Sequence, residues 1–381
     1  MTAQKIGLVV NPLAGVGGPL GLHGSDGVNW HDLAPHTHEH PASIARAARM
    51  VQELLRHGVD AQFLTIGKSM GEQVFQGLAV EPTVVWNPKE WNSTARDTRD
   101  ALLELVRAGS DIIVFVGGDG TAREVLTAIG SHRACIGIPA GVKMRSAVFG
   151  YTPELTAHGV IRFLDKSIGT APAEVVDLME SPDALPSMEF FGTLCVPADP
   201  RNVQVTKSYS SSDSGHEIRQ HLRAVAHDLE PGIIHLIGPG STAKTLMLEL
   251  GHETPVLGVD AVCDGMLVGV DLSEQEIISL AGRGAELSLT LGVIGGQGFL
   301  LGRGNQQISS KVLHMVSKNK IKIVADQDKL DKLNPSRLWV DLDISESPFL
   351  FPRYIKVETG IRKSTIIRTT QVFSEEKEMA T

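Results

Sequence analysis

The sequence has few of the side chains with which proteins bind nucleic acid. Its 35 lysine and arginine residues are outnumbered by 44 aspartate and glutamate residues, which leaves a net charge of -9 at pH 7. Nucleic-acid binding needs a basic surface. Aromatic residues make up only 5% of the chain, so platforms for stacking bases are not expected either. We therefore expect no nucleic-acid partner.

Cysteines and long apolar runs are also scarce. The three cysteines, Cys135, Cys195 and Cys263, are too widely spaced to predict a zinc site or a disulfide framework. No apolar run has the length of a transmembrane helix, and residues 5–10 are typical of a strand rather than of a signal peptide. There is also no basic amphipathic helix. We therefore expect a cytoplasmic protein that does not bind membranes.

What the chain does contain is a regular alternation of strands and helices in its first part. Short apolar runs predict buried strands, and amphipathic segments between them predict helices. This alternation with short connections is typical of a parallel, doubly wound sheet, in which ligands bind beyond the carboxyl ends of the strands. The predicted strands are 5–10, 60–66, 83–86, 112–116 and 134–138, and the main predicted helices are 42–57, about 94–109 and from 121 onward.

The second part of the chain has a different pattern of predicted strands and helices. Its strand-like runs are shorter and its helices fewer, which predicts a β-rich fold. A chain of 381 residues is long enough for two domains. We expect an N-terminal α/β domain at 1–168 and a β-rich C-terminal domain at 169–381, whose tail could pack back on the first domain.

The stretch from 112 to 126 organises the chain. An apolar strand leads into Gly117, Gly118, Asp119, Gly120 and Thr121, and a helix follows. Glycines let the backbone approach a ligand, and a helix N-terminus attracts anions. A carboxylate in such a loop is unusual, so Asp119 suggests a base, or a metal or hydroxyl contact, beside a phosphate. The alternative is a tight turn in which Asp119 caps the helix.

Other polar loops are predicted at the same edge of the sheet. Asn11 follows the first strand, and the glycine-rich loop 15–27 contains Asp26. We interpret 137–149 as a second strand, glycine turn and helix, which would place Lys143, Arg145 and Ser146 beside a phosphate. The alternatives are a surface loop at 15–27, and solvated helix residues at Lys143 and Arg145.

The second part has its own candidate loops. Residues 238–244 again predict a strand, a glycine loop and a helix, without the spacing of a Walker P-loop. Asp260 is either a site carboxylate or a turn residue. Asn305 lies in a polar loop able to hydrogen-bond phosphate or ribose. The candidate ligand residues of the 238–244 loop, which a simple capped helix would also explain, are Gly240, Ser241 and Thr242.

Histidines cluster between the first strand and the first helix. In an extended chain alternate residues share a face, so these side chains could meet a metal ion. The neighbouring prolines favour a solvated connector instead, and we assign no metal ligands. The residues concerned are His31, His36, His38 and His40.

The Gly117–Thr121 pentapeptide resembles the signature of a kinase superfamily that includes NAD kinases, diacylglycerol and sphingosine kinases, and phosphofructokinases. With the other loops, the chain resembles the NAD kinase superfamily, and more closely the AcoX-type branch of ATP-NAD kinase family proteins. The stretches that carry this resemblance span roughly the first 310 residues: 11–15, 21–27, 117–121, 137–149, 238–244, 257–260 and 295–308.

This resemblance implies a two-domain enzyme with a nucleotide site between the domains. Asp119 would deprotonate the 2′-hydroxyl of the adenosine ribose of NAD, which is the substrate, and the Gly240–Thr242 turn would help to bind nucleotide. ATP, Mg²⁺ or another divalent cation, and a homodimer or homotetramer would be expected, with small-molecule nucleotides as the partners.

Two departures from the NAD kinase pattern leave the acceptor open. Lys244 stands where NAD kinases usually carry a tyrosine, and their ribose-binding Asn-Glu pair has no clear match. A kinase of another hydroxyl compound and a non-catalytic nucleotide-binding regulator therefore remain as alternatives.

Overall fold

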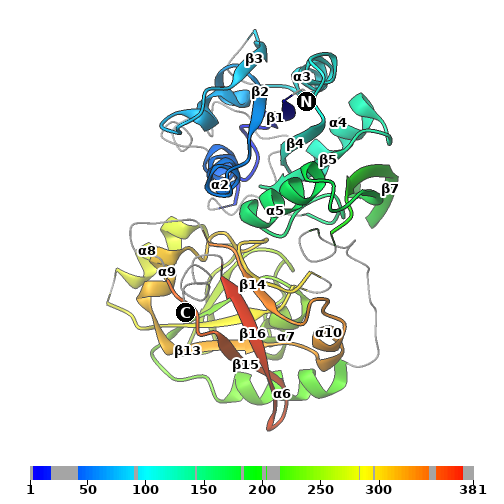
Figure 1. Ribbon diagram of the computed structural model, residues 1–381. Helices are drawn as coiled ribbons and strands as arrows, with labels where there is room; N and C mark the ends of the chain where they lie inside the picture. The colour runs from blue at the N-terminus through cyan, green and yellow to red at the C-terminus, as the bar shows by residue number, and fades with distance from the viewer. Residues whose placement is uncertain are drawn as a thin grey trace. The chain divides into compact units, whose positions relative to one another are not determined.

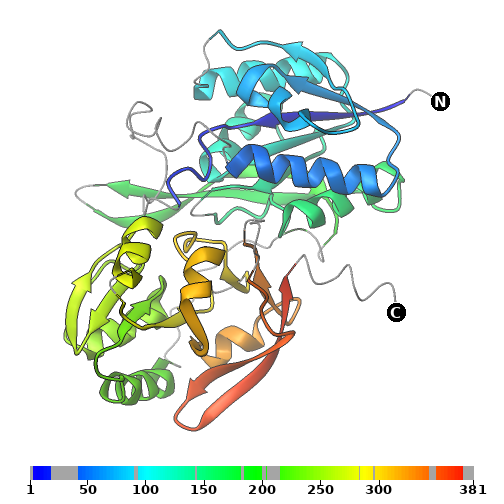
Figure 2. The same ribbon diagram turned by 90° about the vertical axis from the view of Figure 1, so that its left-hand side faces the viewer.

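The computed structural model describes residues 3–18, 42–89, 93–141, 144–181, 184–199, 203, 215–282, 284–294, 297–342 and 349–371. Contacts divide these residues into two compact units, which Figures 1 and 2 show as ribbons. Unit 1 contains 3–16 and the described residues from 42 to 203. Unit 2 contains 17–18 and the described residues from 215 to 371.

Unit 1 is built on a parallel sheet of five strands in the order β3-β2-β1-β4-β5. All six residues of β4 are buried, as a strand covered on both faces requires. The strand order reverses between β1 and β4, and ligands of such sheets bind where this reversal occurs. The strands are β1 (Gln4–Val10), β2 (Ala61–Ile66), β3 (Thr83–Trp86), β4 (Ile112–Gly117) and β5 (Cys135–Pro139).

Helices cover both faces of this sheet, so the predicted doubly wound α/β architecture is confirmed. α2 packs against α5 on one face, and α3 packs against α4 on the other (Figure 1). Thr94 and Asp97 form a capping box that starts α3. The helical elements are α2 (Ala42–Arg56), α3 (Ala95–Arg107), α4 (Asp119–Ile129), α5 (Pro153–Leu164) and the short 3₁₀ helices η1 (Lys68–Met70) and η2 (Glu72–Phe75).

A long antiparallel hairpin, β6 (Thr170–Ser181) and β7 (Ala184–Pro197), also belongs to unit 1. Its backbone is joined to the loop after β5, because Ala147 N–H donates to the Glu174 carbonyl at 2.9 Å. From the sequence we expect a boundary after 168, whereas these contacts extend unit 1 beyond it.

Unit 2 is dominated by a mixed sheet of nine strands in the order β10-β9-β8-β11-β13-β15-β16-β14-β12. This confirms the β-rich prediction. Its strands are β8 (Ile234–Ile237), β9 (Asp260–Cys263), β10 (Met266–Gly269), β11 (Leu287–Gly292), β12 (Phe299–Leu301), β13 (Val316–Val324), β14 (Leu338–Val340), β15 (Tyr354–Gly360) and β16 (Lys363–Gln371). Its helices are α6 (Gly215–His227), α7 (Ser241–Glu249), α8 (Glu274–Ala281), α9 (Ser310–Met315) and α10 (Gln327–Asp331).

The structure corrects one helix predicted from the sequence. The helix predicted within 137–149 is wrong, because residues 144–150 contain no helix. The backbone N–H groups of Arg145 and Ser146 donate to a side chain instead of to helical carbonyls.

Among the described residues, no helix is long and apolar enough to cross a membrane.

Candidate functional site

The candidate site of unit 1 lies where β1 and β4 end side by side. Asn11 follows β1, and its backbone N–H donates to the Val116 carbonyl at 3.0 Å. Its side-chain Nδ2 donates to Thr121 Oγ1 at 3.0 Å, and its Oδ1 accepts from Leu13 N–H at 3.0 Å. Asn11 therefore connects the end of β1 to the first turn of α4 across the reversal of strand order.

The three glycines of the motif have different structural requirements. A Cβ atom on Gly117 would lie 2.3 Å from Thr121 Oγ1. One on Gly118 would lie 3.2 Å from the Cα of Gly141, and one on Gly141 would lie 2.7 Å from the Cα of Gly118. A Cβ on Gly120, in contrast, would meet no atom within 4 Å. Packing therefore explains Gly117 and Gly118, whereas packing places no such requirement on Gly120, whose place beside a ligand stays a prediction.

Asp119 is the first residue of α4 and does not cap it. Gly118 occupies the cap position, and no side chain caps this helix. The carboxylate instead points back to the loop after β5. Its Oδ2 accepts from Arg145 N–H at 2.7 Å, and its Oδ1 accepts from Ser146 N–H at 3.0 Å. The capping alternative is therefore wrong, and Asp119 is only 4% exposed.

The hydrogen bonds from the N–H groups of Arg145 and Ser146 form a clamp on Asp119, and Ser146 is itself held by β6. Its Oγ donates to the Val176 carbonyl at 2.9 Å and accepts from Val176 N–H at 3.1 Å. The first strand of the hairpin thus holds the residue that holds Asp119. This explains why β6 belongs with unit 1.

Burial raises the pKa of Asp119 to about 6, from an ordinary value of 3.8. Hydrogen bonds from Ser146 and Arg145 oppose this rise in the pKa, and the negative charge of Asp177 adds to it. Carboxylates that accept backbone N–H groups often have lowered pKa values, so here desolvation outweighs the hydrogen bonds. A carboxylate with a pKa close to neutrality can take a proton and still be ionised at pH 7.

The start of α4 also offers backbone donors. The first helical hydrogen bond runs from Ala122 N–H to the Gly118 carbonyl at 3.0 Å. The N–H groups of Asp119, Gly120 and Thr121 therefore have no intrahelical partner. Such N–H groups and the helix dipole favour an anion. A proton acceptor and backbone donors suited to an anion thus occur together at this edge.

Unit 2 carries a second glycine turn, at the start of α7. Gly240 has φ of 104°, which a side chain would strain, and it is the cap residue of the helix. Lys329 Nζ donates to Thr242 Oγ1 at 2.7 Å, and burial lowers the Lys329 pKa. Ser241 is exposed at the first helical position. Lys329 has no motif around it, so the sequence offered no signal for this cation.

Asp260 and Asn305 hold their own loops together in unit 2. Asp260 is fully buried, pairs with the ammonium group of Lys244, and accepts from Asp271 N–H at 3.0 Å. Asn305 is 2% exposed. Its Oδ1 accepts from Gly302 N–H at 2.9 Å and its Nδ2 donates to the Leu300 carbonyl at 2.8 Å. A ligand contact for either residue stays a prediction.

Comparison with models of known families shows to which family the chain belongs. The family model described as the ATP-NAD kinase N-terminal domain matches residues 6–167, and the one described as the ATP-NAD kinase C-terminal domain matches 232–369. The chain belongs to the NAD kinase superfamily. No curated protein and no solved structure matches it.

The described candidate residues of this superfamily member fall into two groups. Asn11, Gly117–Thr121, Arg145 and Ser146 come together in unit 1, within the N-terminal match. Gly240, Ser241, Thr242, Asp260 and Asn305 lie in unit 2, within the C-terminal match. The remaining candidates, Asp26 and Lys143, lie outside the described residues, as do His31, His36, His38 and His40.

Proposed function

We propose that this protein transfers the γ-phosphoryl group of ATP to the 2′-hydroxyl of the adenosine ribose of NAD, giving NADP. We also propose that it belongs to the AcoX-type branch. One structural observation gives the main support for this reaction. Asp119 is a buried carboxylate with a raised pKa, clamped beside a helix N-terminus where the strand order reverses. The match to both ATP-NAD kinase domains supports the choice of donor and acceptor.

In this proposal Asp119 accepts the proton of the acceptor hydroxyl. The hydroxyl oxygen then bonds to the γ-phosphorus, the bond from that phosphorus to the β,γ-bridging oxygen breaks, and ADP leaves with the electron pair. Backbone N–H groups of the first turn of α4, and those of the Gly240–Thr242 turn, would stabilise phosphate oxygens. The clamp on Asp119 holds its carboxylate in one orientation, as proton transfer requires.

A divalent cation fits this chemistry. Mg²⁺ is usually held by substrate phosphates and one or two carboxylates, and it would neutralise phosphate charge. In this proposal Asp119 is reserved for the proton of the acceptor hydroxyl, so the substrate phosphates would supply most ligands of the cation. Asp177 is less suitable, because it pairs with Arg123 at 3.1 Å.

The decisive experiment is a screen of the purified chain with ATP and Mg²⁺ against NAD, NADH and other nucleosides, with the product identified by mass spectrometry. We expect NADP from NAD. Asp119→Asn should lower turnover by at least about 100-fold, which is the lower end of the range expected when a general base is lost. The control is Asp111→Asn at the opposite end of β4, whose carboxylate also accepts a backbone N–H, from Lys5 at 2.7 Å.

Two results would count against the proposal. Near-normal turnover by the folded Asp119→Asn protein would remove Asp119 from the mechanism. A failure to bind NAD at millimolar concentration would remove NAD as the acceptor.

A non-catalytic nucleotide-binding regulator is the second candidate. The departure at Lys244 favours it, because this lysine is 5% exposed and engaged by the buried Asp260. Its burial and its pairing leave little of this side chain for a nucleotide to contact. Calorimetry with NAD and ATP, followed by the turnover assay, separates the candidates, since binding without product indicates the regulator.

We further propose that the chain forms a homodimer or homotetramer and binds small-molecule nucleotides. Light scattering coupled to gel filtration would measure its mass. A monomer at micromolar concentration would contradict the oligomer.

A further inference from the structure

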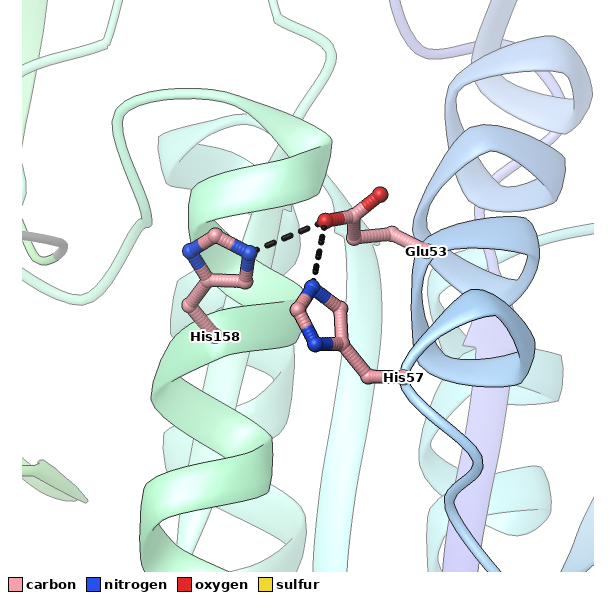
Figure 3. Close-up of side chains that lie close together, drawn as sticks. All are labelled: Glu53, His57 and His158. Atoms are coloured by element: carbon pink, nitrogen blue, oxygen red, sulfur yellow. Dashed lines mark hydrogen bonds and ion pairs between the residues drawn. The ribbon is translucent and has the colours of Figure 1, made fainter. Parts of the chain in front are cut away.

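A cluster of metal-binding side chains lies on the helical face formed by α2 and α5. Glu53 lies in the last turn of α2, His57 directly follows that helix, and His158 projects from α5 (Figure 3). The proposed phosphotransfer uses none of these residues. The two helices are also tied by an ion pair between Arg49 and Glu154 at 2.7 Å, whose side chains are 8% and 14% exposed.

The three side chains converge on one point. Nε2 of His57 lies 3.0 Å from Glu53 Oε1, and Nε2 of His158 lies 2.9 Å from the same oxygen. The rings meet at 88° rather than stacking, with centroids 5.1 Å apart. All three ligand atoms lie within 4.8 Å of one another. Tetrahedral zinc with bonds of about 2.0–2.1 Å separates its ligand atoms by about 3.3 Å, so small shifts would suffice.

Burial and charge also suit a cation. Glu53 is 8% exposed, which holds the carboxylate in place, while the His57 and His158 side chains are 43% and 37% exposed. The Glu53 carboxylate supplies a negative charge beside the two imidazoles. The exposed imidazole side leaves room for water at a fourth position.

We propose that Glu53, His57 and His158 form a binding site for a borderline transition-metal cation, Zn²⁺ above all, with a fourth position open to water. Two imidazoles and one carboxylate are a donor set that binds zinc in other proteins. Bound zinc would tie the end of α2 to α5. The site is independent of the proposed kinase activity.

Arg56 competes for the same carboxylate. Its Nε and Nη2 lie 2.9 Å and 2.7 Å from the two oxygens of Glu53. This arginine is 55% exposed, and exposed pairs of this kind are weak, so its side chain can turn to solvent when the metal binds. Arg56→Ala should therefore tighten zinc binding by up to about fivefold.

The test is zinc binding by the full chain after removal of metal with a chelator, measured by calorimetry and by competition with a chromophoric chelator. The measurements use a background in which His31, His36, His38 and His40 are replaced by alanine, because this other histidine cluster could bind zinc itself. We expect a single zinc ion to bind at micromolar concentration or tighter. Cobalt in its place should give the intense visible absorption of a tetrahedral site.

Four variants then separate this site from surface binding. His57→Ala, His158→Ala and Glu53→Gln should each weaken zinc binding by at least about tenfold. His132→Ala, which removes an exposed histidine elsewhere in unit 1, should change nothing. Zinc should also raise the melting temperature of the background protein by more than that of His158→Ala. No zinc binding at micromolar concentration, or binding unchanged by His57→Ala and His158→Ala in proteins with unaltered circular dichroism, would overturn the proposal.

Discussion

Replacing Asp119 by asparagine should reveal its raised pKa as a pH-dependent difference in stability. The pKa of this carboxyl is about 6 in the folded chain, against an ordinary value of 3.8. A group whose pKa is raised by folding stabilises the fold below its unfolded pKa, and this contribution is lost as the pH rises through the folded pKa. The difference of about 2.2 units corresponds to about 3 kcal/mol.

About 2 kcal/mol of this change should fall between pH 4.5 and 7.5. Wild type should therefore gain about that much stability relative to Asp119→Asn as the pH is lowered across this range. Any constant effect of the amide, such as its NH₂ group facing the N–H of Arg145 or Ser146, cancels from this difference. Only the titration of Asp119 remains.

The assay must report on unit 1 alone, because a chain of two compact units need not unfold in one step. Hydrogen exchange of peptides from β4 and α4, measured by mass spectrometry at several pH values, gives the free energy of opening of this region. Asp111→Asn serves as the control. A flat difference between wild type and Asp119→Asn would refute the raised pKa. The opposite slope would show that the two N–H bonds outweigh burial and lower the pKa.

Three further predictions concern Asp119, the glycines near it and the buried pair of Lys244 and Asp260. If ionised Asp119 is the base, kcat/KM should fall about tenfold per pH unit below pH 6, and a profile that stays flat to pH 5 would exclude this role. Gly141→Ala should lower the free energy of opening of the β4 and α4 region by about 1–3 kcal/mol, measured by the same hydrogen exchange, because its Cβ would lie 2.7 Å from Gly118 Cα. Gly120→Ala should stabilise α4 by about 0.5–1 kcal/mol yet weaken nucleotide binding in calorimetry, and unchanged affinity would remove Gly120 from the site. Lys244→Ala should lower the free energy of unfolding of unit 2 by about 3–5 kcal/mol, because it leaves Asp260 buried and unpaired. The double variant Lys244→Met with Asp260→Asn should recover most of that free energy. Equal losses in the single and the double variant would contradict this interpretation of the pair.

Local sequence determined much of unit 1. The run 112–116 is apolar at every position, so it had to be a strand covered on both faces, and the structure buries all of β4. Thr94 and Asp97 form the capping box that starts α3. Alternation of strands and helices fixes a parallel sheet, and a parallel sheet brings Asn11 and Asp119 to one edge. This much follows from periodicity and chain connectivity.

Tertiary structure decided what those residues touch. No pattern near Asp119 shows that its oxygens accept from Arg145 and Ser146, because these N–H groups come from a loop 26 and 27 residues away. For the same reason the predicted helix in that loop is wrong, since its N–H groups serve a distant carboxylate. His158 likewise reaches Glu53 across 105 residues. Side chains that meet only through packing leave no periodic signal in the sequence, so the clamp on Asp119 and the Glu53, His57 and His158 cluster became visible only in the folded chain.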